Sequence, residues 1–143
     1  MSNFWAMKTF KDWANAFVSN SEIGFDENGV DNDYTTYNVQ QLPNVLENPR
    51  LVRRFDQFCK WAKIGDYVIV GVGPTTQFNM RLIGRIIGDY EFDNQHTPYR
   101  HFRKIEIMKV FNEPIPIEKW GQVQRIELVD DNDFIDTLVK SIH

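Results

Sequence analysis

Aromatic and basic side chains alternate in one segment of this chain, between residues 90 and 104. The segment carries the rings and the basic groups of Tyr90, Phe92, Tyr99 and Phe102 and of Arg100, His101, Arg103 and Lys104. Aromatic rings stack on nucleic-acid bases and cationic side chains bind phosphates, so this combination favours contact with a nucleic acid. The simpler alternative is that the aromatic residues only cover one end of a β-sheet.

The overall charge at first argues against such a partner. The formal net charge is −4 at pH 7, whereas phosphate binding requires local positive charge. The charges are segregated along the chain, because acidic residues gather at 22–33 and 127–136 and basic residues at 50–63 and 81–109. Two acidic blocks can hide a basic face in the sum. On charge alone, however, a solvated surface of mixed sign is the preferred interpretation.

The composition predicts one soluble, cytoplasmic domain that spans residues 1–143. A chain of 143 residues suits a single core, and its 42% hydrophobic content argues against disorder. The one cysteine, Cys59, excludes an internal disulfide and fits a reducing cytosol. Since Cys59 follows Phe55 and Phe58, we interpret it as a buried structural residue. No apolar run approaches the roughly 20 residues of a membrane helix, and the N-terminus does not resemble a signal peptide.

Patterns typical of catalysis or of metal binding are absent from the sequence. There is no G-x-x-x-x-G-K-[ST] loop and no G-x-G-x-x-G after a strand, and the histidines lack metal-ligand spacing. Asp89, Glu91 and Asp93 would share one face of a strand and could hold a cation, but a solvated strand edge is the preferred interpretation. The sequence therefore predicts a binding protein without catalytic residues, cofactor or metal ion.

Helical periodicity occurs in three segments. Thr9–Ser19 should be capped by Thr9 and bury Phe10, Trp13, Ala14 and Phe17. Leu51–Ala62 should follow an Asn48 cap, stop before Gly65 and bury Leu51, Phe55, Phe58 and Ala62, with Trp61 flanking the core. A last helix should be capped by Asp131 or Asn132 and bury Phe134, Leu138 and Ile142. The polar stretch Ser19–Tyr37 is expected to be a long loop.

Runs of β-branched and aromatic residues predict strands at Phe4–Met7, Asp66–Val72, Met80–Ile87, His101–Phe111 and Val123–Val129. Gly73–Pro74 should form a turn, and the sequence Glu-Pro-Ile-Pro at 113–116 should end the strand before it. Helices come early and strands cluster from the middle onward. This order predicts an α+β fold, with a curved, mostly antiparallel sheet or partial β-barrel flanked by helices.

Several motifs occur in a recognisable order: FWAMK, EIGFDENGV, AKIGDYVIV, LIGRIIGDYEFD and HFRKIEIM. In this order they resemble the EVE-like branch of the PUA superfamily, a group of YTH-like reader domains found at the N-terminus of McrB-type modification-dependent restriction GTPases. Gly65-Asp66 matches the family's G-D strand start. The later matches are Ile83–Ile87, the Asp89–Asp93 turn and Arg103-Lys104-Ile105.

The resemblance implies an aromatic-walled pocket on the sheet for one modified base, which in a duplex must be flipped out. We expect the pocket to be formed by Trp5, Phe25, Tyr90 and Phe92, with Asp26 and Asn28 binding the edge of the base. Phosphate contacts are expected from Arg81, Arg100, His101, Arg103 and Lys104. The implied partner is DNA with a modified base, with RNA as an alternative, in a restriction or phage-defence system with a McrB-type GTPase or nuclease and no membrane.

Two other classes of function remain open. Related PUA-like folds include small hydrolases and ribonucleases, in which case Lys8, Glu22 or Lys104 would be catalytic. The acidic surfaces would instead suit a protein-interaction adaptor. Binding to modified and unmodified DNA and RNA would separate a reader from both alternatives.

Overall fold

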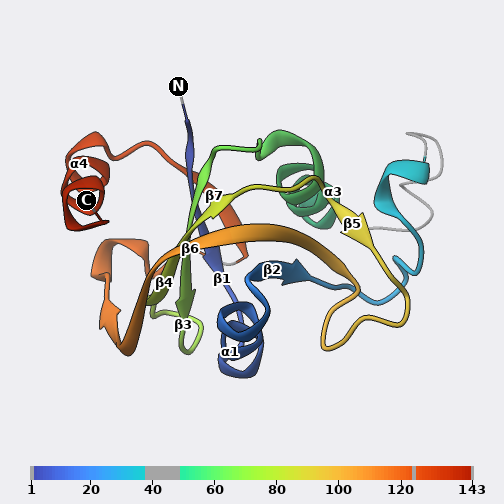
Figure 1. Ribbon diagram of the computed structural model, residues 1–143, viewed down its shortest axis with the longest axis horizontal. Coiled ribbons are helices and arrows are strands. Elements are labelled where there is room, and N and C mark those ends of the chain that lie inside the picture. The colour runs from blue at the N-terminus through green and yellow to red at the C-terminus, as the bar shows by residue number, and fades with distance from the viewer. Residues whose placement is uncertain (1, 38–48, 124, 143) are drawn as a thin grey trace.

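The fold is built on a mixed β-sheet that curls into a half-barrel (Figure 1). The computed structural model describes residues 2–37, 49–123 and 125–142. Its strands are β1 (Phe4–Lys8), β2 (Glu22–Phe25), β3 (Tyr67–Val72), β4 (Asn79–Ile86), β5 (Glu91–Phe92), β6 (His101–Pro116) and β7 (Ile126–Val129). They lie in the order β2-β6-β4-β3-β1-β7, and β5 also pairs with β6. Only β1 and β3 are paired in parallel among these described strands.

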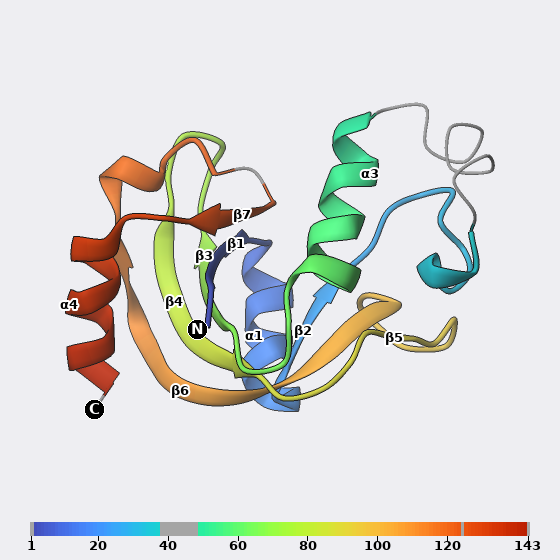
Figure 2. The same ribbon diagram turned by 90° about the horizontal axis from the view of Figure 1, so that it is seen from above.

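Within the described residues, three α-helices cover the sheet on its two sides (Figure 2). They are α1 (Lys11–Asn20), α3 (Pro49–Asp56) and α4 (Asn132–Ile142). α3 continues directly into a π-helical turn, η2 (Gln57–Trp61), and short 3₁₀ turns form at η1 (Tyr34–Thr36) and η3 (Glu118–Trp120). α1 and α3 lie on one side of β3 and β4, and α4 lies on the other side (Figure 2). No helix of these described segments is long and apolar enough to cross a bilayer.

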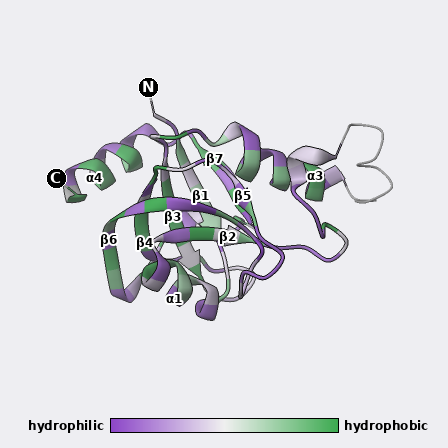
Figure 3. Ribbon diagram, turned by 45° about the vertical axis from the view of Figure 1, so that its right-hand side comes forward, coloured by the Kyte–Doolittle hydropathy of each residue, from purple (hydrophilic) through white to green (hydrophobic). Residues whose placement is uncertain are grey.

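The sheet buries both of its faces because the central strands are apolar at successive positions. Trp5 and Met7 of β1 pack into an inner core with residues of α1 and α3. Phe4 and Ala6, which point to the opposite face, pack into an outer core with residues of α4 and η3. Figure 3 shows the matching alternation of hydrophobic and hydrophilic residues along the helices.

The predicted fold class is confirmed, and three strand predictions need correction. The 19–37 stretch is not entirely loop, because β2 lies within it and pairs with His101–Lys104 of β6. β5 lies within the predicted turn at 89–93. The Glu-Pro-Ile-Pro sequence does not end β6, since Ile115 and Pro116 pair with Met80 and Asn79 at the edge of β4. Pro116 is tolerated because it is the last residue of its strand.

The helix predictions are confirmed in position and corrected in detail. Phe10 is not buried: it is the N-cap residue of α1, and 57% of its surface is exposed. Thr9 does not cap this helix. In the α3 segment Phe55, Phe58 and Ala62 are buried as predicted, but Trp61 points to solvent. Asp131 does cap α4, because its Oδ1 accepts a hydrogen bond from the N–H of Phe134 at 3.1 Å. The predicted Asn48 cap lies outside the described residues.

A substitution at Gly24 in β2 would test how tightly the inner core is packed. A Cβ at this position would lie 1.9 Å from Cδ1 of Tyr99, whose ring is fully buried on top of it. We expect Gly24→Ala to lower the free energy of unfolding by about 1–3 kcal/mol, because neither the ring nor the strand can move away cheaply. Urea denaturation would measure the change. Ser19→Ala, on the exposed face of α1, should stay within about 0.5 kcal/mol of wild type, and an equal effect of both would contradict this packing.

Candidate functional site

Trp5 and Phe25, two of the predicted base-stacking residues, lie inside the inner core. Their exposed fractions are 3% and 2%. The indole Nε1 of Trp5 donates a hydrogen bond to Oδ2 of Asp66 at 3.0 Å. Phe25 packs edge-on against Phe55, with ring centroids 4.7 Å apart. In this conformation neither residue lines an open pocket, because the sheet and α3 enclose both.

Tyr90, the third predicted pocket residue, belongs to a hydrogen-bonded relay around His101. The N–H of Tyr34 donates to the hydroxyl of Tyr90 at 2.9 Å, and that hydroxyl lies 2.6 Å from Nδ1 of His101. On the other side of the imidazole, Nε2 lies 3.0 Å from the carbonyl oxygen of Val30. A carbonyl can only accept, so Nε2 carries the proton and Nδ1 accepts from Tyr90. Phe92 packs beside the same imidazole, 4.9 Å between centroids.

His101 is therefore not at the surface, where the sequence predicted a phosphate ligand. It is fully buried, and this burial lowers the pKa of the imidazole, opposed in part by the bond to Val30. Protonation would also remove the acceptor that Tyr90 uses. The geometry defines a neutral, structural histidine that holds the 30–34 segment against β6.

Arg103 is likewise enclosed, with 2% of its surface exposed. Its guanidinium donates to the carbonyl oxygens of Phe58, Ala62 and Gly88. Arg103 was predicted to bind phosphate, but its N–H groups are already bonded to these carbonyl oxygens. The bonds hold its side chain between η2 and Gly88. Its position supports a structural role.

Arg100 is half-buried and paired with carboxylates. Its Nη2 lies 2.7 Å from Oδ1 of Asp26, and its Nη1 lies 2.8 Å from Oδ1 of Asp31. Burial pushes the pKa of Asp26 upward, but the hydrogen bonds from Arg100 outweigh it and hold that pKa below its ordinary value. Asp26 is thus occupied by Arg100 and does not point an available acceptor at a base. Arg81 also bonds within the fold, to the carbonyl oxygen of Phe111 at 3.2 Å.

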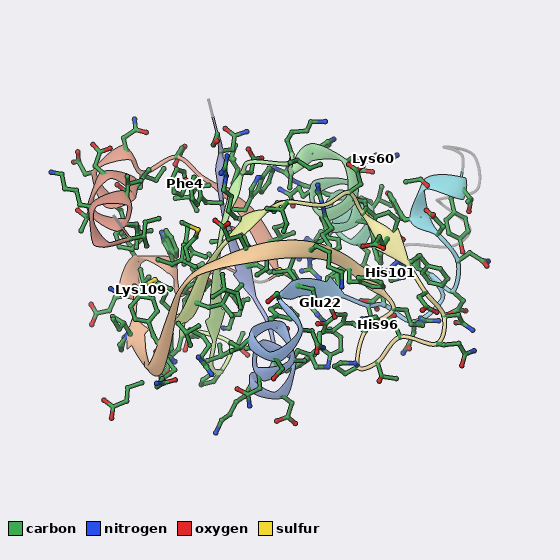
Figure 4. All side chains as sticks on the ribbon, viewed as in Figure 1. Phe4, Glu22, Lys60, His96, His101 and Lys109 are labelled. Atoms are coloured by element: carbon green, nitrogen blue, oxygen red, sulfur yellow. The ribbon has the colours of Figure 1, made fainter. Side chains whose placement is uncertain are left out.

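Glu22 is the centre of a second buried polar cluster (Figure 4). Its carboxylate, 1% exposed, accepts from the hydroxyl of Tyr99 at 2.9 Å and contacts His96 at 2.8 Å and Lys104 at 3.2 Å. The ring of His96 also stacks on Phe102. This cluster joins β2 to β6 and to the 93–100 loop. It places Glu22 and Lys104, candidates of the enzyme hypothesis, in an ion pair.

Lys8 and Cys59 are two further side chains with reactive groups, an amine and a thiol. Lys8 is 8% exposed and donates to the carbonyl oxygen of Pro74, and its burial lowers the pKa of the ammonium group. The thiol of Cys59 packs against the inner core, and burial raises its pKa, so little thiolate forms near neutrality. In the described part of the chain, no group of histidine, cysteine and carboxylate side chains has the arrangement of a metal site.

The open surface has three neighbouring hollows that meet at Arg125. The first, about 410 Å³, includes Lys8, Phe10 and Arg54 in its walls. The second, about 470 Å³, is lined by Arg50, Arg53 and Arg54 of α3, by Arg125 just before β7, and by the carboxylate residue Glu127 of β7. The third, about 570 Å³, is lined by Trp13, Asp26, Glu27, Asn28, Asp31, Pro98, Arg100 and Arg125. Arg125 lines all three, so we call them together the Arg125 groove.

The chemistry of the Arg125 groove changes along its length. The second hollow concentrates arginines, and burial together with the neighbouring Arg125 and Arg50 lowers the pKa of Arg54. The third hollow has an aromatic wall, Trp13, whose ring packs edge-on against Phe10 and Tyr99. Asn28, a predicted edge-binding residue, is exposed in this same hollow. One end of the groove suits phosphates and the other suits a planar polar ring.

The structure thus brings together only part of the predicted site. Asp26, Asn28 and Arg100 line the groove, whereas half-buried Tyr90 and Phe92 pack around His101 at the β5–β6 end of the sheet. The sequence did contain the missed signal, because the 50–63 basic segment supplies the arginines of the second hollow. Arg125 could not be found this way, since it lies alone in the chain and reaches the groove through the pairing of β7 with β1.

The half-barrel and its helices have a fold similar to that of solved YTH domains. A hypothetical protein from Leishmania major has a TM-score of 0.58 at 8% identity, covering 98% of this chain and 94% of that one. The YTH domain of Zygosaccharomyces rouxii MRB1, solved with N6-methyladenosine RNA, has a TM-score of 0.55 at 12% identity, covering 99% and 85%. A Pseudomonas putida protein scores 0.53 at 12% identity, covering 97% and 98%.

The chain belongs to the family described as domain of unknown function DUF8426, whose model matches residues 10–128. No curated protein matches the sequence. The similarity to solved YTH domains supports the fold that the motifs predicted. The association with McrB-type restriction GTPases stays a prediction.

The buried imidazole of His101 makes stability depend on pH. The unfolded chain binds a proton with the ordinary histidine pKa, 6.5, whereas the folded chain binds it only at lower pH. The unfolded state then holds more protons, so we expect the free energy of unfolding to fall as the pH decreases below 6.5. Denaturation between pH 7 and pH 5 would measure the slope.

His101→Gln should reduce this slope, because an amide can bond to both Val30 and Tyr90 without titrating. His96→Gln is the matched control, because it removes another histidine of the described residues and leaves His101 in place. Titration of the His101 ring by NMR at or above the ordinary pKa would contradict a neutral structural role and would restore it as a candidate phosphate ligand.

Proposed function

We propose that this protein is a reader of nucleic acids that binds one modified base in the Arg125 groove. The observation that carries the proposal is that Arg125 lines both an arginine-rich hollow and a hollow with an aromatic wall and polar rim. A nucleotide has the same two parts, a phosphate and a planar ring. The fold supports the proposal because a YTH domain of similar fold was solved with N6-methyladenosine RNA.

The second hollow would hold the phosphates. Arg50 and Arg53 are exposed on α3, and Arg125 lies opposite them at the start of β7. Arginine binds phosphate oxygens through paired N–H groups, which positions the strand without reading its sequence. The acidic net charge does not oppose this, because four arginines line the second hollow against one carboxylate residue, Glu127.

The third hollow would hold the base. Trp13 offers a ring edge or face as one wall, and Asn28 can donate and accept hydrogen bonds at the edge of a base. A single stranded or flipped-out base is required, because a stacked base could not reach these groups. Phe25 and Trp5 would support the wall from inside the core.

RNA is the first candidate ligand because the YTH domain of MRB1 was solved with RNA. DNA with a modified base, as read by the McrB-associated domains that the motifs resemble, is the second. A catalytic role is not part of the proposal, since the buried candidates Lys8 and Glu22 are bonded within the fold.

The test is a binding titration with matched short single strands of RNA and DNA. Each strand carries one N6-methyladenine, one 5-methylcytosine or the unmodified base. We expect a modified strand to bind about fourfold more tightly than its unmodified partner, the gain from burying one methyl group. Equal binding to every modified and unmodified pair would overturn the reader function.

Variants separate the two ends of the groove. Arg53→Ala should weaken binding to modified and unmodified strands alike, and should flatten the slope of log K against log salt by about 0.7–0.9. Arg85→Ala, an exposed arginine of β4 outside the three hollows, is the control and should change neither. Asn28→Ala and Trp13→Phe should reduce the preference for the modified base and leave the salt slope intact. An unaltered preference in both would place the base elsewhere.

A further inference from the structure

The guanidinium of Arg125 lies over two aromatic rings from different parts of the chain. Its Cζ is 5.6 Å from the ring centroid of Phe10, before α1, and 5.7 Å from that of Phe25, at the end of β2. Phe10 is mostly exposed, but Phe25 is 2% exposed. A guanidinium is flat and stacks on rings as a base does. Arg125, which lines the groove, therefore lies over the ring of Phe25, which does not line it.

The backbone of Arg125 is held by the sheet, whereas its guanidinium has only ring contacts among the described residues. Its backbone is fixed, because its carbonyl oxygen accepts from the N–H of Lys8 at 2.7 Å and the next residue, Ile126, pairs with Met7. Within the described residues, no hydrogen bond or ion pair involves the guanidinium, and cation–π contacts at such sites are weak. Arg54 is close enough for like-charge repulsion, which helps to lower the pKa of Arg54.

The hollows around Arg125 offer its guanidinium other positions. Arg125 lines the arginine-rich second hollow as well as the first and third, so a rotation of its side chain would carry the guanidinium from one hollow to another while the backbone stays in place. A phosphate in the second hollow would supply the partner that the guanidinium lacks among the described residues. The same phosphate would screen its repulsion from Arg54.

We infer that Arg125 is a movable cover: in the free protein it occupies the stacking face of Phe25, and an entering base displaces it toward the phosphate. The inference rests on the proposed function. Displacement of Arg125 would also expose the ring of Phe25, which the guanidinium covers in the free protein. Closing the pocket with a residue of its own reduces the apparent affinity for a base by the closed fraction.

The experiment uses free N6-methyladenosine nucleoside as the probe, because it has a base and no phosphate. Arg125→Ala removes the cover, so we expect this variant to bind the nucleoside about three- to tenfold more tightly than wild type, the factor that one or two weak cation–π contacts represent. The same variant should lose salt dependence for a modified oligonucleotide, since a phosphate contact is gone. Arg125→Lys keeps a cation and should stay closer to wild type, and Arg85→Ala should not differ.

A second measurement does not depend on tight binding. In NMR spectra of the free protein, ring currents should shift the δ protons of Arg125 upfield, Phe10→Ala should reduce that shift, and saturation with nucleoside should abolish it. An unshifted Arg125 in the free protein, or unchanged or weaker nucleoside binding by Arg125→Ala, overturns the cover. If the cover is overturned but modified strands still bind more tightly than unmodified ones, the proposed reader function is retained and only the role of Arg125 as a cover is rejected. Absence of any preference would overturn the reader function itself.

Discussion

The buried guanidinium of Arg103 is the contact on which the arrangement of helix and sheet depends. It lies on β6, the strand that pairs with β2, β4 and β5, and donates to carbonyl oxygens at the end of the α3–η2 helix. Carbonyls at a helix C-terminus lack intrahelical partners and carry partial negative charge, so a cation there satisfies both needs. Loss of this contact would leave buried acceptors unpaired and would free the helix that carries the groove's arginines.

Two polar clusters connect further segments to the same N-terminal end of β6. Neutral His101 connects Val30 and Tyr90, and Glu22 connects Tyr99, His96 and Lys104. Each relay fixes a segment without regular structure to the same strand. These contacts hold β2 and its flanking loops to β6, and half-buried Trp13 and exposed Asn28 line the third hollow beside them. Rigid positioning of this kind is what a binding site for one planar ring needs.

The sequence predicted the fold better than the site, and the reason is physical. Periodicity and strand propensity depend on neighbours along the chain, so the helices around Phe17 and Phe55 and the strands around Ile69 and Ile83 could be recognised. β2 could not, because it is short and flanked by Asn, Asp and Gly, and its pairing with β6 is a long-range contact. Likewise, a basic residue in sequence does not reveal whether it faces carbonyls, as Arg103 does, or solvent, as Arg53 does.

The arginines show how an acidic protein can still present a cationic groove. Arg100 forms ion pairs with Asp26 and Asp31, and the guanidinium of Arg103 donates hydrogen bonds to backbone carbonyl oxygens. Both therefore contribute to the fold and add little to the outside field. Arg125, by contrast, is half-exposed and lies over two rings, close to Arg54. Like charges held together in this way raise the energy of the free groove, and an anion that enters lowers it. The distribution of partners, and not the sum of charges, decides where a nucleic acid would be attracted.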